Sequence, residues 1–257
     1  MFLIINMLYL IGLGIYDEGD ISIKGVEILK RVDRIYAELY TSFFNGDLKT
    51  IENWVGKRIN ILDREDLEGH PEDNILYNSS KKDVALLVCG DPLIATTHAD
   101  ILLRANKMGI KVKVIHSSSV YSAIAETGLH IYKFGKTTTL PFPEKKYFPT
   151  SPYNVIKENL RGGMHTLILL DIKYEEKRFM TINEGIEILL KMEKIKRENV
   201  IDNETLIVGV ARLGNDTTIK TGTLNDLIDF NFGGPPHSII IPANLHFTEE
   251  EMLNLFK

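Results

Sequence analysis

The chain has 257 residues, of which 44% are hydrophobic and 25% charged, and its formal net charge is −5 at pH 7. This composition is typical of a globular protein with one large or two medium domains. An acidic balance gives no broad basic field, so no nucleic-acid partner is expected. The single cysteine, Cys89, excludes an internal disulfide and favours a cytoplasmic location. The apolar start of the chain is far shorter than the roughly twenty residues that span a bilayer, so no membrane partner is expected.

The N-terminal region predicts a strand, a glycine-rich turn and a helix. Residues 7–13 form a buried-strand pattern that ends in Gly-Leu-Gly at 12–14. Apolar residues then recur at spacings of three and four and predict an amphipathic helix over residues 28–39. This order is typical of dinucleotide-binding folds, but the place of their third glycine holds Asp17, whose charge would repel a pyrophosphate. A dinucleotide-binding oxidoreductase stays as an alternative from a different functional class.

The central stretch predicts a ligand contact at a strand end. Residues 84–88 are a continuous apolar run, typical of a strand buried on both faces, and Gly-Asp-Pro follows at 90–92. In parallel α/β sheets small ligands bind beyond the carboxyl ends of the strands. Asp91 is therefore a candidate ligand contact, although aspartate before proline is also a common turn former.

A third strand end repeats this arrangement. A helix over residues 99–108, closed by Gly109, precedes a strand over 112–115. His116 and three serines follow, and a helix is predicted over residues 120–126. The serines are either helix caps or ligand contacts. The repeated strand–helix–strand order predicts a parallel sheet.

The second half of the chain predicts further strands over residues 166–170, 205–211 and 238–241. Capping boxes at Thr181 with Glu184, and at Thr248 with Glu251, predict helices to residue 196 and at the C-terminus. In the same half, residues 133–152 predict a proline- and lysine-rich segment that is either a long loop or a strand and a loop. The loop is either solvated or a docking surface for a partner macromolecule, formed by aromatic residues together with Lys133, Lys136, Lys145 and Lys146.

The chain lacks the motifs of several enzyme classes. It has no CxxC pair, HExxH helix, aspartate-rich calcium loop or P-loop, so neither a dedicated metal site nor nucleotide hydrolysis is expected. The remaining strand ends carry glycine, serine and aspartate, which suit a small polar cofactor held mainly by backbone groups. Methyl transfer fits such a site, because a sulfonium donor is already activated and mainly needs its acceptor held in line.

Five segments, spread along the whole chain, resemble segments of the tetrapyrrole methylase superfamily and, within it, of the diphthine synthase family. They are GLGIYDEGD, GDPLIATTHAD, HSSSVYSAIAETGLHIYKFGK, HTLILLDIK and PPHSIIIPANLH. Tetrapyrrole methylases usually carry a proline–glycine pair after the first glycines, whereas this chain has Ile15 and Tyr16. This departure supports the diphthine branch and argues against a corrin substrate.

The resemblance implies an α/β protein with a mainly parallel sheet in residues 1–117 and a mixed sheet in residues 118–257. It implies that S-adenosylmethionine binds in a cleft between these domains, usually in a homodimer. The implied reaction is repeated methylation of the amino group of a modified histidine, the diphthamide precursor, in translation elongation factor 2, which gives diphthine. A methyltransferase of the same fold that acts on a corrin or another tetrapyrrole is the alternative.

The resemblance also implies which residues contact the cofactor. By position they are Ile15, Asp91, Ile94, Ser119, Val120, Leu170, Leu213 and His237. Several would act through the backbone. His98 and Asp171 are weak candidates for the base that accepts the amine proton, and catalysis by positioning alone is the alternative.

Overall fold

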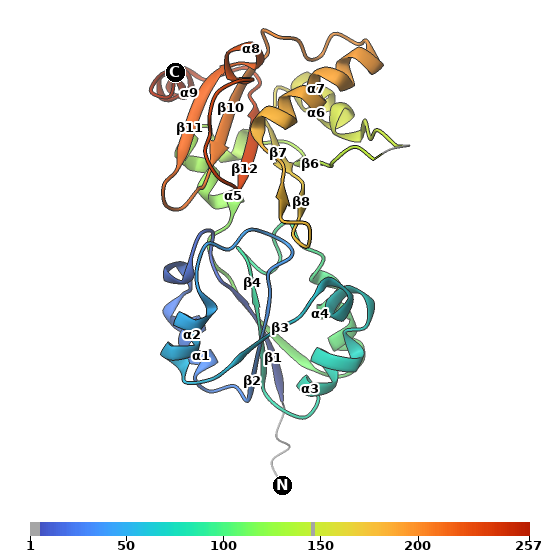
Figure 1. The fold of residues 1–257 in the computed structure, drawn as a ribbon, viewed down its shortest axis with the longest axis vertical. Helices are drawn as coiled ribbons and strands as arrows, with labels where there is room; N and C mark the ends of the chain where they lie inside the picture. The colour runs from blue at the N-terminus through green and yellow to red at the C-terminus, as the bar shows by residue number, and fades with distance from the viewer. Residues whose placement is uncertain (1–5, 145–146) are drawn as a thin grey trace. The chain divides into compact units, whose positions relative to one another are not determined.

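The computed structural model describes residues 6–144 and 147–257. By their internal contacts these residues divide into an N-terminal unit that ends at Ala123 and a C-terminal unit from Ile124 to Lys257 (Figure 1). The boundary expected from the sequence lies a few residues earlier, after residue 117. Each unit has its own sheet and is described by itself. No helix among the described residues is long and apolar enough to cross a membrane.

The N-terminal unit is built on a parallel sheet with the strand order β3-β2-β4-β1-β5. Its strands are β1 (Met7–Gly12), β2 (Arg34–Glu38), β3 (Ile59–Ile61), β4 (Val84–Val88) and β5 (Lys111–Ile115). Its helices are α1 (Ile23–Leu29), α2 (Leu48–Val55), α3 (Tyr77–Ser79), α4 (Ala99–Lys107) and α5 (Val120–Ala123). Strand β4 is central and buried at every residue, which confirms the strand predicted from its continuous apolar run.

Helices cover both faces of this sheet (Figure 1). On one face, Leu29 of α1 and Ile51 of α2 belong to the same core cluster as Ile35 of β2. On the other face, Ile101 of α4 belongs to a cluster with Leu86 of β4. Because alternate residues of each strand supply the two clusters, the sheet is apolar on both sides, as a sheet of buried parallel strands requires.

The helix predicted over residues 28–39 is wrong beyond its first two residues. Helix α1 ends at Leu29, and the chain enters β2 at Arg34. The backbone N–H groups of Asp33 and Arg34 donate to the carbonyl of Asp83, at 2.9 and 3.3 Å, just before β4 begins. Pairing with β4 therefore outweighs continuation of the helix, since it gives the apolar residues of 35–38 a place in the buried sheet.

The C-terminal unit is built on a mixed sheet with the order β11-β10-β12-β7-β6, in which only the β6–β7 pair is parallel among the described strands. Its strands are β6 (Thr138–Leu140), β7 (Thr166–Leu170), β10 (Leu206–Ala211), β11 (Thr218–Thr223) and β12 (His237–Ile241), with a small hairpin of β8 (Ile172–Lys173) and β9 (Arg178–Phe179). Its helices are α6 (Ser151–Arg161), α7 (Ile182–Lys196), α8 (Leu224–Leu227) and α9 (Phe247–Asn254). The parallel and mixed sheets confirm the expected fold class.

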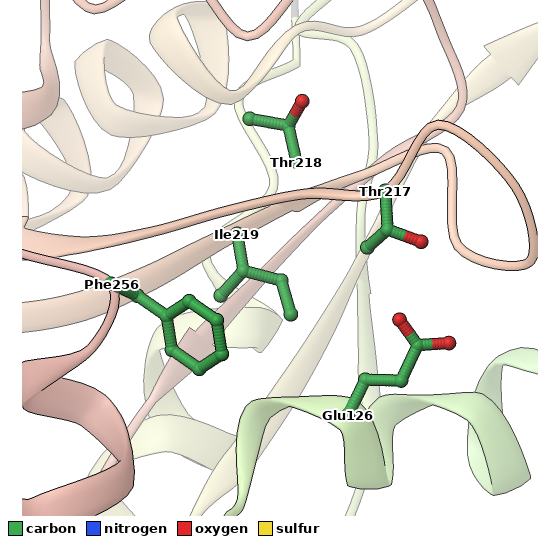
Figure 2. Close-up of a pocket in the computed structure, with 5 residues that line it drawn as sticks. All are labelled: Glu126, Thr217, Thr218, Ile219 and Phe256. Atoms are coloured by element: carbon green, nitrogen blue, oxygen red, sulfur yellow. The ribbon is translucent and has the colours of Figure 1, made fainter.

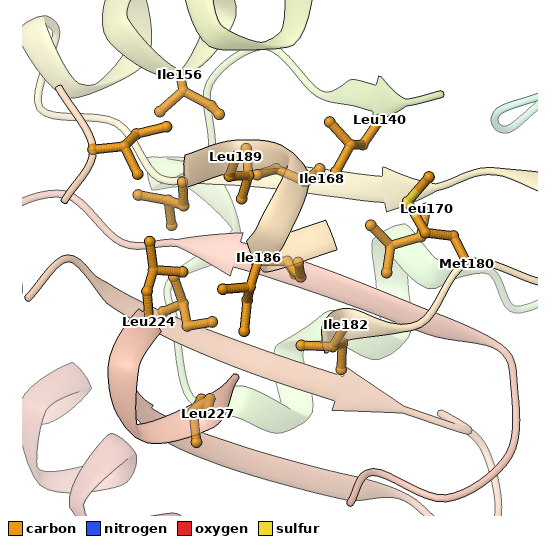
Figure 3. Close-up of a cluster of buried hydrophobic side chains, with 14 of the residues drawn as sticks. Leu140, Ile156, Ile168, Leu170, Met180, Ile182, Ile186, Leu189, Leu224 and Leu227 are labelled. Carbon is orange, nitrogen blue, oxygen red and sulfur yellow. The ribbon is translucent and has the colours of Figure 1, made fainter. Parts of the chain in front are cut away.

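The core of this unit lies where α7 packs on the sheet. Ile186 and Leu189 of α7 belong to one buried cluster with Leu140 of β6, Ile168 of β7 and Leu227 of α8 (Figure 3). The predicted capping box at the start of α7 is confirmed, with the Thr181 side chain accepting the N–H of Glu184 at 3.2 Å. The cap therefore fixes where the core helix begins.

Two other expectations for the C-terminal unit are wrong, the second only in part. The capping box of α9 joins His246 and Glu249 rather than Thr248 and Glu251, because the buried Glu249 carboxylate accepts the His246 N–H at 2.7 Å. Residues 133–152, expected to be a long loop or a strand and a loop, contain the strand β6, which agrees with the second alternative, and also the start of α6, which neither alternative includes. Helix α6 tolerates Pro152 in its first turn, where the missing N–H would have no helical partner.

Candidate cofactor site

The carboxyl ends of β4, β1 and β5 lie side by side in the N-terminal sheet and are joined by backbone hydrogen bonds. Gly14 and Gly90 form a bridge, in which the Gly90 N–H donates to Gly14 O at 2.8 Å and the Gly14 N–H donates to Gly90 O at 3.2 Å. A Cβ atom added to Gly12 would lie 2.5 Å from Gly90 O and 2.7 Å from Ser117 Cβ. The three turns that the sequence singles out therefore meet at one edge.

Asp91 holds two of these strand ends together. Its side chain is 6% exposed. One carboxylate oxygen accepts the Leu93 N–H at 3.0 Å, within its own turn. The other accepts the Ser117 N–H at 3.2 Å and contacts Nδ1 of His116 at 2.8 Å, both after β5. The carboxylate thus has partners within the unit, and its position at the edge of the sheet is fixed.

Asp20 ties the segment after β1 to the same edge. Its carboxylate accepts the Tyr16 N–H at 2.8 Å, and its carbonyl accepts the Ser117 hydroxyl at 3.2 Å. A Cβ on Gly14, whose φ is +90°, would lie only 2.1 Å from Asp20 Cβ. Asp20 therefore fills the space beside the glycine turn, and the next α-helix begins only at Ile23. What directly follows the glycines is a short 3-10 helix, Glu18–Asp20, and not the N-terminus of an α-helix, which argues against a dinucleotide site.

The proposed cofactor residues of the N-terminal unit all follow these strand ends. Ile15 follows β1, Ile94 lies in the turn after β4, and Val120 begins α5 after β5; each is half-buried. Ser119 is buried, and its carbonyl accepts the N–H groups of the first turn of α5. The sequence therefore predicts a set of residues that the fold brings to one edge.

This edge fits a small organic cofactor better than a phosphate-rich one. The half-buried side chains of Ile15, Ile94 and Val120 offer apolar surface. A Cβ at Gly90 would meet nothing closer than Ser118 O at 4.0 Å, so there is open space beside this backbone. The chemistry of the residues, main-chain polar groups with aliphatic side chains and one carboxylate, suits a cationic nucleoside such as S-adenosylmethionine.

The proposed cofactor residues of the C-terminal unit also converge. Strand β12 pairs with β7 and β10, and His237 lies opposite Ala211 while Ser238 lies opposite Leu169. Leu170 ends β7, and Leu213 follows β10 by two residues. Leu170, Leu213 and His237 therefore meet at one end of this sheet, and all three are buried.

His237 is a neutral imidazole with both ring nitrogens engaged. Nδ1 accepts the Ile182 N–H at 3.2 Å, so Nε2 carries the proton and donates to Gly234 O at 2.9 Å. Burial lowers the pKa of His237, and the neighbouring Arg212 charge lowers it further. A cofactor would therefore meet the backbone of His237 rather than its ring.

Arg212 is a residue of this edge that the sequence does not indicate. Its guanidinium donates to Phe232 O at 2.6 Å, to Gly234 O at 2.8 Å and to the Thr218 hydroxyl at 2.7 Å. The side chain thus joins the loop before β12 to β11. The contacts span up to 22 residues of sequence, so no local pattern could have revealed them.

The surroundings of His98 and Asp171, the two weak candidates for the base, do not suit that role. His98 is 1% exposed and burial lowers its pKa, so its ring cannot reach an amine that arrives from solvent to be methylated. The Asp171 carboxylate accepts the N–H groups of Phe142 and Ile172, both at 2.9 Å, which orient the start of the β8 hairpin. Within residues 6–144 and 147–257, no group of three or more acidic, histidine or cysteine side chains could hold a metal ion.

A separate surface pocket of about 520 Å³ lies in the C-terminal unit (Figure 2). Glu126, Thr217, Thr218, Ile219 and Phe256 line it. None of the proposed cofactor residues is among them, although Thr218 pairs with Ala211 at the end of β10 and accepts a hydrogen bond from Arg212.

Comparison with known proteins gives a consistent relationship over almost the whole chain. Residues 7–228 match the family described as Tetrapyrrole (Corrin/Porphyrin) Methylases. The chain is 49% identical over 249 residues to a diphthine synthase of Methanococcus aeolicus, covering 96% of each. It is 48% identical over 251 residues to a diphthine synthase of Methanocaldococcus jannaschii, covering 96% of this chain and 97% of the relative.

Solved structures extend the likeness to three dimensions. A crystal structure of an Entamoeba histolytica protein superposes with a TM-score of 0.91 at 43% identity and covers 98% of each chain. A crystal structure of diphthine synthase superposes with a TM-score of 0.88 at 36% identity, covering 97% of this chain and 95% of the other.

Proposed function

The chain belongs to the tetrapyrrole (corrin/porphyrin) methylase family, and on that premise we propose that it is a methyltransferase of diphthamide biosynthesis. It transfers methyl groups from S-adenosylmethionine to the amino group of the modified histidine in elongation factor 2, which gives diphthine. The near-full-length likeness to diphthine synthases carries this proposal. The same likeness disfavours the corrin-methylating and dinucleotide-binding alternatives.

The residues of each unit have distinct parts in the proposed reaction. When bound, S-adenosylmethionine supplies a methyl group on a positively charged sulfur, which leaves as a neutral thioether. Ile15, Ile94 and Val120 offer apolar contact, and Asp91 keeps the strand ends in place. In the C-terminal unit the backbone at His237 adds polar groups. These groups hold the reactants in line, which is the main requirement of a displacement at carbon.

The direct test uses elongation factor 2 that carries the unmethylated precursor. Incubation with the protein and S-adenosylmethionine, followed by mass spectrometry of the histidine-containing peptide, should show one, two and three added methyl groups. A folded protein that leaves this peptide unchanged would contradict the proposal. Methylation of a tetrapyrrole instead would favour the corrin alternative, and calorimetric binding of a nicotinamide dinucleotide alone would favour an oxidoreductase. Sedimentation of the purified protein would test the proposed homodimer.

Replacing Asp91 by alanine should weaken cofactor binding while the fold survives. The change leaves the N–H groups of Leu93 and Ser117 without their acceptor, which should lower the free energy of unfolding by about 2 kcal/mol. The dissociation constant for S-adenosylmethionine, measured by calorimetry, should rise by about tenfold. Asp100→Ala is the control, because Asp100 lies on α4 in a surface ion pair. An unchanged dissociation constant would remove Asp91 from the cofactor set.

Charge reversal in the lysine-rich segment should weaken docking of the protein substrate. Lys133 does not belong to a docking surface, because its ammonium pairs with the buried Glu249 and donates to Asn244 O at 2.8 Å. Lys136 is exposed, and Lys145 and Lys146 lie outside the described residues. Changing these three lysines to glutamate should raise the KM for elongation factor 2 by about tenfold, at roughly 0.5 kcal/mol per charge.

The control for this prediction is Lys107→Glu at the end of α4. In both variants the dissociation constant for S-adenosylmethionine should stay unchanged, because the charges act on the protein substrate alone. The increase in KM should shrink at high salt, which screens exposed charges. An unchanged KM in the triple variant would exclude the segment as the docking surface.

A further inference from the structure

An exposed histidine and a buried carboxylate form a pair at the carboxyl edge of the N-terminal sheet. His116 directly follows β5, and its side chain is 70% exposed. Asp91, whose side chain is 6% exposed, contacts Nδ1 of His116 at 2.8 Å. The carboxylate is itself held by the N–H groups of Leu93 and Ser117. The ring therefore has a fixed partner on one side and solvent on the other.

The partner determines which ring nitrogen carries the proton. An ionised carboxylate only accepts hydrogen bonds, so Nδ1 of His116 is protonated and donates to Asp91. In the neutral ring the free electron pair is then on Nε2. Among residues 6–144 and 147–257 no side chain or backbone group bonds to this nitrogen, so Nε2 is free to accept a proton from a molecule in solvent.

The other histidines lack this combination of features. His98, His165 and His237 are buried, and burial lowers the pKa of each. His130 is partly exposed and its Nδ1 lies 3.6 Å from the buried Glu249 carboxylate, but its Nε2 contacts the Thr248 hydroxyl at 3.3 Å and so is not free. The ring of His246 contacts the same hydroxyl through Nδ1 at 2.8 Å. His70 is exposed, but its contact at 3.4 Å is to the exposed Glu65, so no buried carboxylate orients its ring. His116 is thus the histidine that a buried carboxylate orients and that solvent still reaches.

We propose that His116 is the general base that takes the proton from the acceptor amine. The inference rests on the proposed function, in which the acceptor is an amino group on a protein. Such an acceptor arrives from solvent and needs an exposed base near the cofactor. His116 lies three residues before Ser119, in the segment proposed to contact the cofactor. A base held by a third group within hydrogen-bond distance is the arrangement that activates nucleophiles in many enzymes.

The proton balance of the reaction defines when the base acts. A protonated amine has no free electron pair, so Nε2 of His116 first removes one proton. The amine nitrogen then forms a bond to the methyl carbon, the carbon–sulfur bond breaks, and its electron pair stays on sulfur. The product is again a protonated amine, and His116 passes its proton to water. Three such rounds replace three N–H protons by three methyl groups and end at the trimethylammonium, which has no proton left to lose.

Few charges surround the ring on the elements beside it. Of the described charged side chains, Asp91 is the one that bonds to the ring. Asp20 contacts the residue after His116, because its carbonyl accepts the Ser117 hydroxyl. Its carboxylate accepts the Tyr16 N–H. Asp91 lies at the protonated Nδ1 side and would stabilise the imidazolium that forms on proton transfer.

The variant His116→Asn separates proton transfer from structure. The asparagine amide can replace Nδ1–H as the donor to Asp91 but has no basic nitrogen. At pH 7 the methylation rate should fall by about 10²- to 10⁴-fold. The dissociation constant for S-adenosylmethionine, measured by calorimetry, should stay within about twofold of the wild-type value. The rate deficit should shrink as the pH rises, because more of the amine is then already neutral. His70→Asn, an exposed histidine of the same unit, should keep the wild-type rate.

The nitrogen resonances of the free protein give a readout that does not depend on activity. In a ¹⁵N-labelled sample, with His116 assigned by comparison with His116→Asn, the neutral ring should carry its proton on Nδ1. A neutral ring protonated on Nε2, or a His116→Asn variant that methylates at the wild-type rate, would overturn the proposal. An inactive wild-type protein with the Nδ1–H form present would instead contradict the proposed function, so the two failures are distinguishable.

Discussion

Glu249→Ala is expected to lower the free energy of unfolding of the C-terminal unit by about 3 kcal/mol, because it removes a fully buried carboxylate that pairs with the partly exposed Lys133. The Glu249 carboxylate pairs with the Lys133 ammonium and accepts the N–H groups of His130 at 2.8 Å and His246 at 2.7 Å. Its remaining contact is Nε2–H of His165 at 3.0 Å. With alanine these donors lose their acceptor, and the Lys133 charge is left without a counter-ion.

The same carboxylate joins parts of the unit that are distant in sequence. His165 stands just before β7, Lys133 lies before β6, and Glu249 is in the first turn of α9. Nδ1 of His165 accepts the Ala243 N–H at 2.9 Å, which fixes Nε2 as the donor to Glu249. Loss of Glu249 should therefore loosen α9 first and then the strand ends that it holds.

Urea unfolding followed by circular dichroism would measure the loss, and hydrogen exchange of peptides from residues 124–257 would locate it. Glu251→Ala is the matched control, since Glu251 lies on the same helix and is exposed. Its free energy of unfolding should stay within about 0.5 kcal/mol of the wild-type value. Equal stabilities of the Glu249 and Glu251 variants would contradict a structural role for the buried carboxylate.

Acid should destabilise this unit through the same group. Burial alone would raise the pKa of Glu249, but the His246 N–H, the Lys133 ammonium and its other donors hold the pKa at about 2, below its ordinary value of 4.5. The resulting stability is fully present above pH 4.5 and is lost as the pH falls towards 2. Burial lowers the pKa of His165 from its ordinary value of 6.5. Below pH 6.5 this histidine therefore binds a proton more readily in the unfolded chain than in the folded unit, which lowers the free energy of unfolding.

The strands that the sequence predicts best are those buried on both faces. Residues 84–88 and 166–170 are continuous apolar runs, and both are strands with those same bounds. Strand β2 was missed because its apolar residues continue the spacing of α1, and only pairing with β4 distinguishes a strand there. Strand β11 is polar, with the sequence Thr-Ile-Lys-Thr-Gly-Thr, and forms because β10 offers it an edge. Periodicity cannot report a pairing partner that is distant in sequence.

For the candidate site, too, the sequence predicts local features but not the contacts between residues that are distant in the chain. Turn residues such as Gly90 and Asp91 could be recognised locally, because glycine and aspartate before proline are characteristic of turns. The contact between Asp91 and His116 spans 25 residues and that between Asp20 and Ser117 spans 97, so neither could be read from spacing. The sequence therefore indicates which strand ends form the site, whereas the side chains that join them become visible only in the fold.

Gly12→Ala is expected to be strongly damaging at these strand ends, although Gly12 lies outside the left-handed region that constrains Gly14. The new Cβ would lie 2.5 Å from Gly90 O and 2.7 Å from Ser117 Cβ, where contacts between such atoms are normally about 3.5 Å. Relief requires the end of β1 to move roughly 1 Å away from both neighbours. That movement would break the hydrogen bonds between Gly14 and Gly90, since the Gly14 N–H to Gly90 O distance is already 3.2 Å. We expect a loss of about 3 kcal/mol in the free energy of unfolding of the N-terminal unit.

Cofactor binding should weaken as well in this variant, because the displaced strand end carries Ile15 and faces the turn that contains Asp91. Calorimetry should show an increase of at least about tenfold in the dissociation constant for S-adenosylmethionine. Trp54, the single tryptophan, lies on α2, so its fluorescence follows unfolding of the N-terminal unit alone. Gly162→Ala, in the C-terminal unit, is the control for cofactor binding, since its new methyl would meet the flexible end of Met164 at 2.9 Å and two backbone oxygens at an ordinary 3.5 Å. A Gly12→Ala protein with wild-type affinity would mean that the cofactor does not depend on the packing of these three strand ends.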